Sequence, residues 1–337
     1  MKKLCAVAAT VSVFLFMAGV DVYADQAAWD KLYEAAKKEG EVIYNPAEDL
    51  GPYKAIADAF QKKFPGIRVR LVSVGATQLA SRIVMEAGAK KISMDVSRMT
   101  IELSMPMLDR DIARPFDWTG FDIPSDDILL DGKVLRYTLF PYVFYYNHTL
   151  VSQKEAPKTW DDLLDPKWKG KMCFHNVSPN ITTMVHEWGL ERWRSYVKKL
   201  ATQEAITALR GMEILSKIQS GERVIGNNAM EHIMQEVKKE APFTISPVSP
   251  QGAFASDHMS FKDCPHPNAA KLLMAWLVSP EGRAVAREKN IGLGPEFQQI
   301  LKEKGIRLVL AKTMEQARSS LQVQQEFMET MGFVPKK

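Results

Sequence analysis

The chain has 337 residues, of which 46% are hydrophobic and 25% charged, and its formal net charge is +4. This length allows two domains of roughly 100–200 residues each. Basic and acidic residues are interleaved along the chain, which excludes the concentrated basic stripe of a nucleic-acid-binding protein.

The N-terminus has the pattern of a secretory leader. Lys2 and Lys3 form a basic start, and an apolar run covers residues 7–20. This run is shorter than the roughly 20 residues of a spanning helix, which disfavours an uncleaved anchor. Val22-Tyr23-Ala24 offers small residues to a signal peptidase. We therefore expect residues 1–24 to be a signal peptide that is cleaved before Asp25, leaving a periplasmic protein of charge about +3.

Helices and strands alternate through the first half of the mature chain. Apolar residues recur at helical spacing or in short runs, and Gly40 and Pro65-Gly66 supply stops. The expected order is helix 29–36, strand 41–44, helix 52–64, strand 67–72, helix 77–87 and strand 94–97. Alternation of this kind predicts βαβ units on a mostly parallel sheet, and hence an α/β fold.

The second half begins after a loop-rich stretch, 121–140, and an apolar run that reaches Tyr146. The same criteria then predict strand 171–175, a helical region 178–200, helix 205–219, strand 223–225, helix 230–240, strand 245–248, helix 269–277 and a C-terminal helix 312–331.

Four segments in this order resemble one family. They are 29–43 (WDKLYEAAKKEGEVI), 59–67 (AFQKKFPGI), 157–171 (PKTWDDLLDPKWKGK) and 269–282 (AAKLLMAWLVSPEG). Together with the run Pro141-Tyr-Val-Phe-Tyr-Tyr-Asn147, they are similar to the periplasmic solute-binding proteins of ABC importers, in the group that includes ferric-ion-binding proteins.

The resemblance implies a type II periplasmic-binding-protein architecture, in which two mixed sheets flanked by helices are joined by a two-segment hinge. Lobe 1 would comprise 25–141 plus 257–337, and lobe 2 would comprise 142–256. A ligand would lie in the cleft, and hinged closure would present the protein to a permease in the inner membrane. We expect a monomer with no nucleic-acid partner and no enzymatic activity.

Ligands of open α/β sheets bind beyond the carboxyl ends of the strands. The loops expected at those ends, together with the two crossover segments, supply the candidate ligand-binding residues. They are Asn45, Glu48, Ser73, Gly75, Ala76, Thr77, Ser97, Arg98, Tyr142, Tyr145, Asn176, Ser178, Asn180, Asn227, Asn228 and Gln251.

Several candidates have the chemistry of an anion site. The loops 73–77 and 176–180 lead into expected helices, whose N-terminal amides bind carboxylate or phosphate. Thr77 and Ser178 are equally suited to capping those helices. Arg98 offers two parallel hydrogen bonds to a carboxylate, or an ion pair with Glu102 one turn on.

A metal site has less support. Ferric-binding members of the family use adjacent tyrosines in lobe 2, and Asn227-Asn228 stands at that position. Neutral amides are poor ferric ligands. Tyr145 and Tyr146 point to opposite faces of the crossover strand, so at most one of them joins Tyr142 at the cleft. We therefore expect a small organic anion of carboxylate, phosphate or phosphonate type, with no metal or cofactor, and keep a ferric ion as the alternative.

A cleft enzyme is the second alternative, since Cys173 lies near a strand end with His175 two residues on. No oriented third group accompanies them, and a buried small apolar residue is the simpler interpretation. Whether Cys173 and Cys264 form a disulfide is left open by their spacing.

Overall fold

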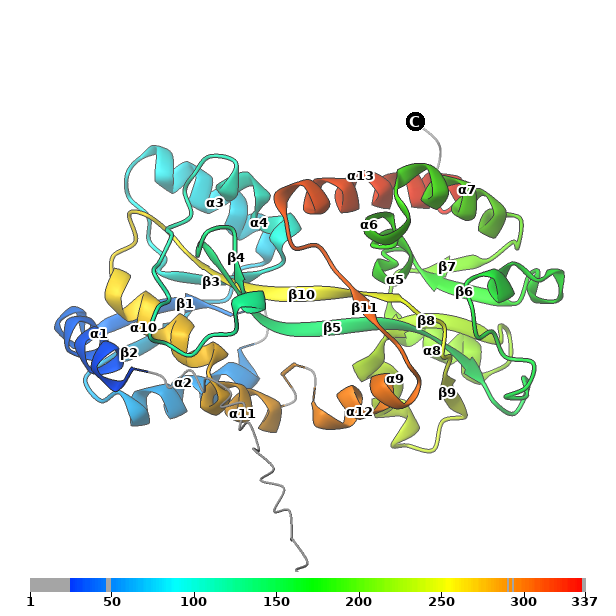
Figure 1. The fold of residues 1–337 in the computed structure, drawn as a ribbon, viewed down its shortest axis with the longest axis horizontal. Coiled ribbons are helices and arrows are strands. Elements are labelled where there is room, and N and C mark those ends of the chain that lie inside the picture. Colours follow the sequence, from blue (N-terminus) through cyan, green and yellow to red (C-terminus); the bar gives the residue numbers. More distant parts are fainter. Residues whose placement is uncertain (1–24, 47–49, 290, 293, 335–337) are drawn as a thin grey trace, which may run out of the picture.

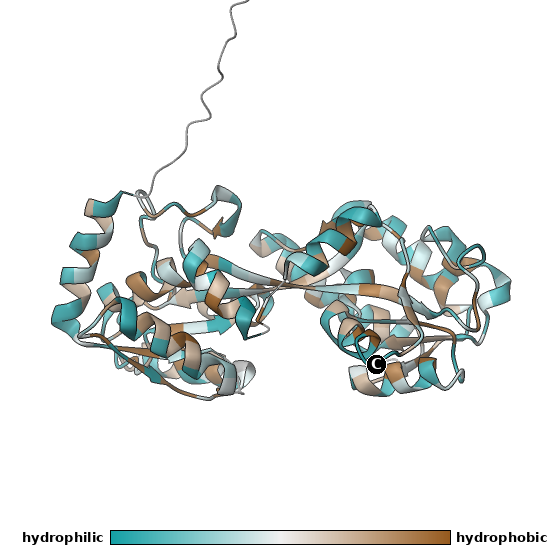
Figure 2. Cartoon of the chain, turned by 90° about the horizontal axis from the view of Figure 1, so that it is seen from below, coloured by the Kyte–Doolittle hydropathy of each residue, from teal (hydrophilic) through white to brown (hydrophobic). Residues whose placement is uncertain are grey.

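A computed structural model describes residues 25–46, 50–289, 291–292 and 294–334. The expected leader, 1–24, and the candidate Glu48 lie outside these residues. Two α/β lobes lie at either end of an elongated molecule (Figure 1), and a view turned by 90° shows the narrow waist between them (Figure 2). None of the helices within the described ranges is long and apolar enough to cross a membrane.

The first lobe is a sheet covered by helices on both faces. On one face, a core that includes Phe60 and Trp276 lies under α1 (Gln26–Glu39), α2 (Gly51–Lys63), α10 (Pro267–Val278) and α11 (Pro280–Glu288). On the other face, Ile83 and Met107 belong to the core under α3 (Ala76–Gly88) and α4 (Ile101–Leu108). The strands of this lobe are β1 (Glu41–Asn45), β2 (Arg68–Leu71), β3 (Val96–Met99) and β4 (Ile128–Leu129).

The second lobe repeats this arrangement. Trp193 and Phe174 lie in a core beside α5 (Pro179–Thr182), α6 (Val185–Trp188) and α7 (Leu190–Ala201). Ile214 and Ile233 lie in the core on the opposite face, beside α8 (Gly211–Gln219), α9 (Met230–Val237) and α12 (Pro295–Glu303). The strands here are β6 (Met172–His175), β7 (Ile206–Ala208), β8 (Ile225–Ala229) and β9 (Phe243–Ile245), and β11 (Leu308–Val309) pairs with the start of β10.

Two long strands, β5 (Val134–Asn147) and β10 (Gln251–Ser260), run through the waist and are antiparallel to each other. In the first lobe β10 pairs with β3, and in the second lobe β5 pairs with β8 and β9. The strand order is therefore β2-β1-β3-β10-β5-β8-β6-β7. The two expected sheets are linked into one, because the hinge strands themselves hydrogen-bond in both lobes.

Several expected elements differ from the observed ones. The strands expected over 94–97 and 245–248 lie at Val96–Met99 and Phe243–Ile245, and three further elements differ more strongly. The helical region 178–200 is three helices, broken at Gly189, whose φ of 76° suits a residue without a side chain. The helix expected over 205–219 begins only at Gly211, because 206–208 form β7 and pair with β6. The strand expected over 223–225 extends to Ala229, so Asn227 and Asn228 lie on a strand rather than in a loop.

The C-terminal helix α13 (Met314–Thr330) contacts both lobes (Figure 1). Ala317, near its start, packs with Ile101 and Met105 of α4. Val323 and Phe327, near its end, belong to the core of the second lobe. The segment 257–337, expected to belong wholly to lobe 1, is thus divided between the lobes, since its apolar residues face α7 as well as α4.

A buried ion pair lies in the hinge. Asp257 of β10 is opposite Arg136 of β5, the two side chains are 2% and 7% exposed, and the nearest atoms are 3.7 Å apart. The Asp257 carboxylate has no hydrogen-bond partner among the described residues. Burial raises the pKa of Asp257 from 3.8 to about 7; Arg136 opposes this shift, while Glu102 and Asp127 add to it.

This raised pKa predicts a pH-dependent stability. Between about pH 4 and pH 7 the folded chain holds a proton on Asp257 that the unfolded chain has lost, so the free energy of unfolding falls as the pH rises. We expect Asp257→Asn to remove a slope on the order of 1 kcal/mol per pH unit from urea-unfolding data over this range. Asp126→Asn, at an exposed carboxyl, is the control. An unchanged slope in Asp257→Asn would contradict the assignment.

Candidate functional site

A cavity of about 440 Å³ lies between the lobes at the hinge. Its walls come from the carboxyl ends of β1 and β3 in the first lobe and from the start of α9 in the second, and its floor comes from β5 and β10. Its lining includes Asn45, Arg98, Phe140, Tyr142, Glu231, His232 and Phe254. Its size falls in the range of about 300–1,000 Å³ that is usual for small-molecule sites.

Arg98 is the cation of this cavity. Its Nη1 donates a hydrogen bond to the Pro46 carbonyl at 3.1 Å, and its Nε is buried and has no partner among the described residues. The guanidinium carbon lies 5.6 Å from the ring centroids of both Tyr53 and Phe140. Among the described residues no carboxylate lies within ion-pair distance of Arg98, so the expected alternative pair with Glu102 does not form. The remaining N–H groups are suited to bind an external anion.

Tyr142 lies on the cavity floor, edge-on to His175 and to Phe254, with ring centroids 5.9 and 5.6 Å apart. Burial raises the pKa of its phenol. The phenol is therefore protonated at neutral pH, which makes Tyr142 a hydrogen-bond donor and a poor source of the phenolate that a ferric ion prefers.

Glu231 and His232 form part of the second-lobe wall, on the first turn of α9. The sequence alone places them on a solvated helix face. His232 is indeed exposed, but Glu231 is half-buried, and burial raises the pKa of its carboxyl against the opposing effects of His232 and Arg98. Across the described ranges no three His, Cys, Asp or Glu side chains gather closely enough to hold a metal ion.

The first of the two loops that the sequence analysis predicts to bind an anion borders the cavity. Asn45 is a lining residue, and its Nδ2 donates to the Val74 carbonyl at 2.9 Å, which ties β1 to the start of α3. That helix begins at Ala76, with Gly75 before it and no side-chain cap, so Thr77 does not cap it. Ser73 and Thr77 are exposed beside the cavity rather than among its lining residues.

The second loop is fixed in the interior of the second lobe. The Asn227 Oδ1 accepts from the His175 amide at 2.7 Å, and its Nδ2 donates to Ser178 Oγ at 2.9 Å and to Asn180 Oδ1 at 2.8 Å. All three candidate side chains are fully buried. The Ser178 hydroxyl donates to the His175 carbonyl and does not cap α5. This cluster holds β8 to the turn after β6.

The remaining candidates lie outside the cavity lining. Asn228 donates to the Gly211 carbonyl at 2.8 Å, and Gln251 Oε1 accepts from the Phe144 amide at 2.8 Å. Tyr145 packs on Phe243 in the core of the second lobe and is fully buried. Ser97 is buried within β3, and Asn176 follows β6. The structure thus brings together Asn45, Arg98 and Tyr142 from the expected set.

Sequence reasoning missed the aromatic floor. Phe140 and Phe254 are directly opposite each other in the β5–β10 ladder and both line the cavity. Neither follows the carboxyl end of a strand, and the candidates taken from the crossover segments were Tyr142, Tyr145 and Gln251. Two aromatic residues in the crossover segments were the available signal, but the strand register that makes them neighbours is not visible in the sequence.

Within the part of the chain that the structure describes, Cys173 and Cys264 form no disulfide. Cys173 lies in a core of the second lobe and Cys264 in a core of the first. Burial raises the pKa of Cys173 to about 12, so its thiol is protonated and unreactive. The nearby His175 accepts a hydrogen bond from the Val177 amide at its Nδ1. This environment does not support Cys173 as a nucleophile.

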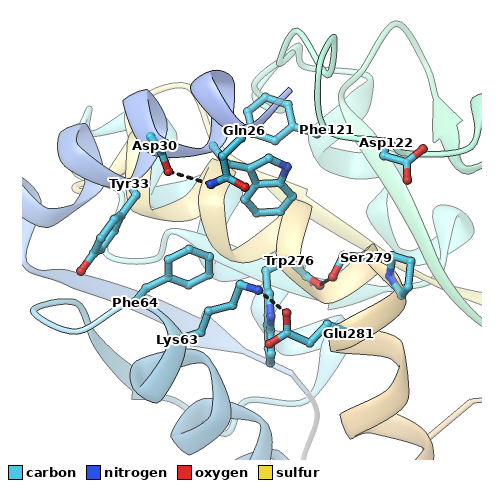
Figure 3. Close-up of a pocket in the computed structure, with 12 residues that line it drawn as sticks. Gln26, Asp30, Tyr33, Lys63, Phe64, Phe121, Asp122, Trp276, Ser279 and Glu281 are labelled. Atoms are coloured by element: carbon cyan, nitrogen blue, oxygen red, sulfur yellow. Dashed lines mark hydrogen bonds and ion pairs between the residues drawn. The ribbon is translucent and has the colours of Figure 1, made fainter. Parts of the chain in front are cut away.

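A second cavity, of about 340 Å³, lies at the far side of the first lobe (Figure 3). Trp276, Phe64 and Phe121 line it, and Lys63 at its edge is paired with Glu281. All of its lining residues belong to the first lobe, so lobe closure would not enclose a ligand there. The cavity at the hinge is therefore the candidate site.

Comparison with solved structures supports the fold. A structure from Trichodesmium, determined with iron and citrate ligands, matches with a TM-score of 0.71 at 18% identity over 88% of this chain and 100% of that one. A periplasmic binding protein from Actinobacillus pleuropneumoniae with bound fructose-6-phosphate matches with a TM-score of 0.65 at 16% identity over 88% of this chain and 99% of that one.

The sequence comparisons agree with the structural comparisons. An Fe(3+)-binding periplasmic protein from Serratia marcescens is 23% identical over 281 residues, which cover 76% of this chain and 78% of the relative. The family model of the bacterial extracellular solute-binding proteins matches residues 55–304. Because this match spans most of the chain and the two-lobed architecture agrees with it, the chain belongs to the family of bacterial extracellular solute-binding proteins.

Proposed function

We propose that this solute-binding protein captures a small organic anion in the hinge cavity and delivers it to an inner-membrane ABC permease. It would act in the periplasm as a monomer, after removal of residues 1–24. The single observation that carries the anion assignment is Arg98, a cavity guanidinium without a carboxylate partner among the described residues. A carboxylate, phosphate or phosphonate would supply the missing acceptor.

Binding without chemistry is the simplest role for this site. The hinge strands are continuous between the lobes, which is the arrangement that allows closure around a ligand. Cys173, the candidate nucleophile, lies in the interior of the second lobe instead of at the cavity.

A ferric ion is the alternative cargo, favoured by the name of the Serratia marcescens relative. The chemistry of this cavity favours the anion. Its nearest candidates for metal ligands are Glu231, His232 and Tyr142, and the phenol of Tyr142 has a raised pKa.

A thermal-unfolding screen of the mature chain tests the proposal. A ligand at 100 times its Kd should stabilise the fold by about 2.7 kcal/mol. We expect this shift with members of a panel of organic carboxylates, phosphate esters and phosphonates, and no shift with a ferric salt. A shift produced by ferric salts alone would overturn the anion assignment and favour the iron alternative.

A further inference from the structure

The floor of the hinge cavity is an aromatic surface. Phe140 and Phe254 are cross-strand neighbours, and Tyr142, two residues beyond Phe140 on β5, projects from the same face of the strand. All three line the cavity and are half-buried, and the ring centroids of Tyr142 and Phe254 are 5.6 Å apart. Because β-strands alternate, this face offers three rings side by side to whatever fills the cavity.

The cation of the cavity adjoins these rings. The guanidinium carbon of Arg98 lies 5.6 Å from the Phe140 ring centroid. A carboxylate bound by Arg98 would therefore carry its own carbon skeleton directly over Phe140 and towards Phe254. A planar aromatic skeleton gains edge-to-face or offset-stacked contacts in such a position, which a saturated skeleton of equal size does not.

Part of the first-lobe wall is apolar. Val74, Leu79 and Leu103 contribute apolar surface. Asn45 donates its amide to the Val74 carbonyl, and the Thr100 hydroxyl accepts from the Leu103 amide at 3.4 Å. Hydroxyl groups of a sugar phosphate that face Val74, Leu79 and Leu103 would lack partners, at a cost in affinity.

The opposite wall limits the charge of the ligand. Glu231 lies on the second-lobe side, near enough to Arg98 for the two groups to interact electrostatically. Arg98 on one wall and Glu231 on the other suit a ligand with a single negative group at one end. A second carboxylate at the other end would face Glu231 and be repelled.

We propose that the ligand of this cavity is an aromatic monocarboxylate, with its carboxylate on Arg98 and its ring on Phe140, Tyr142 and Phe254. This inference rests on the proposed function, which requires only an organic anion, and narrows it to one chemical class.

Benzoate and cyclohexanecarboxylate provide the sharpest test, because they have the same charge and the same carbon skeleton size but differ in planarity. We expect isothermal titration calorimetry of the wild-type chain to give benzoate a roughly ten-fold lower Kd. Fructose 6-phosphate and ferric citrate complete the panel, since similar proteins were solved with related ligands.

Phe254→Leu is the matched variant, since it keeps apolar volume and removes one ring. We expect it to weaken benzoate binding by about three- to ten-fold and to change cyclohexanecarboxylate binding by less than about two-fold. Its thermal unfolding curve checks that the hinge remains folded.

The outcomes distinguish a failure of the aromatic assignment from a failure of the proposed organic-anion role. If cyclohexanecarboxylate or the sugar phosphate binds as tightly as benzoate, the aromatic assignment is wrong while the organic-anion role stands. If Phe254→Leu weakens both carboxylates equally, the ring contact is likewise wrong. If no organic anion binds and only iron does, both the aromatic assignment and the proposed organic-anion function are wrong.

Discussion

Replacing Arg98 by methionine should lower the affinity of the hinge cavity for an organic anion by roughly 100-fold, since charge-assisted hydrogen bonds of about 1.5–3 kcal/mol are lost. Methionine keeps a long apolar stem against Tyr53 and Phe140, so the cavity wall should stay filled. Titration calorimetry of the variant, with a ligand identified by the thermal screen, measures the change.

Arg70→Met is the control for net charge. Arg70 lies on β2 with a side chain that is 46% exposed and paired with Glu41, away from the cavity lining. Its replacement removes the same unit charge, and exposed ion pairs contribute little to stability. If the two variants lost affinity equally, Arg98 would act through the overall charge of the protein and the direct contact would be disproved.

Asn227→Leu is expected to lower the free energy of unfolding by about 3–4 kcal/mol, because it leaves buried polar groups without partners. The His175 amide and the Asn180 amide oxygen lose their partner, and the Ser178 hydroxyl keeps only its bond to the His175 carbonyl; all three asparagine contacts are shorter than 3 Å. Urea unfolding followed by circular dichroism provides the measurement.

Gln322→Leu, an exposed amide on α13, is the matched substitution and should change stability by less than about 0.5 kcal/mol. The folded Asn227→Leu protein should also keep the wild-type Kd, because Asn227 does not line the cavity. If the variant had wild-type stability but impaired ligand binding, Asn227 would be a ligand-binding residue and not a structural one.

Part of the first lobe could be predicted from local signals. Gly40 ends α1 with a φ of 72°, and Pro52 lies in the first turn of α2, as their sequence positions predict. These features depend on neighbours within a few residues. The errors fall where tertiary pairing decides: β7 forms within an apparent helix because β6 lies beside it in register.

Only part of the site could be predicted from the sequence, because the rest depends on pairing between strands that are far apart in the chain. Arg98 and Asn45 follow from the rule that ligands bind at strand ends, and Tyr142 from its place in the crossover. Phe254 pairs with Phe140 across more than a hundred residues of sequence, and this register depends on the complete hinge. Asn227, a predicted ligand-binding residue, instead bonds to its neighbours within the second lobe and does not line the cavity, because polar residues near a strand end can serve either purpose.

Helix α13 makes unequal attachments to the two lobes. Towards the first lobe it offers Ala317 and an ion pair between Arg318 and Asp109, whose side chains are 55% and 34% exposed, a type of pair worth about 0–1 kcal/mol. Towards the second lobe it buries Phe327 completely, a contribution of about 1.5–3 kcal/mol. If the lobes close about the hinge as proposed, we expect α13 to remain with the second lobe and to slide along α4. Closure would then move one helix past another on the outer surface.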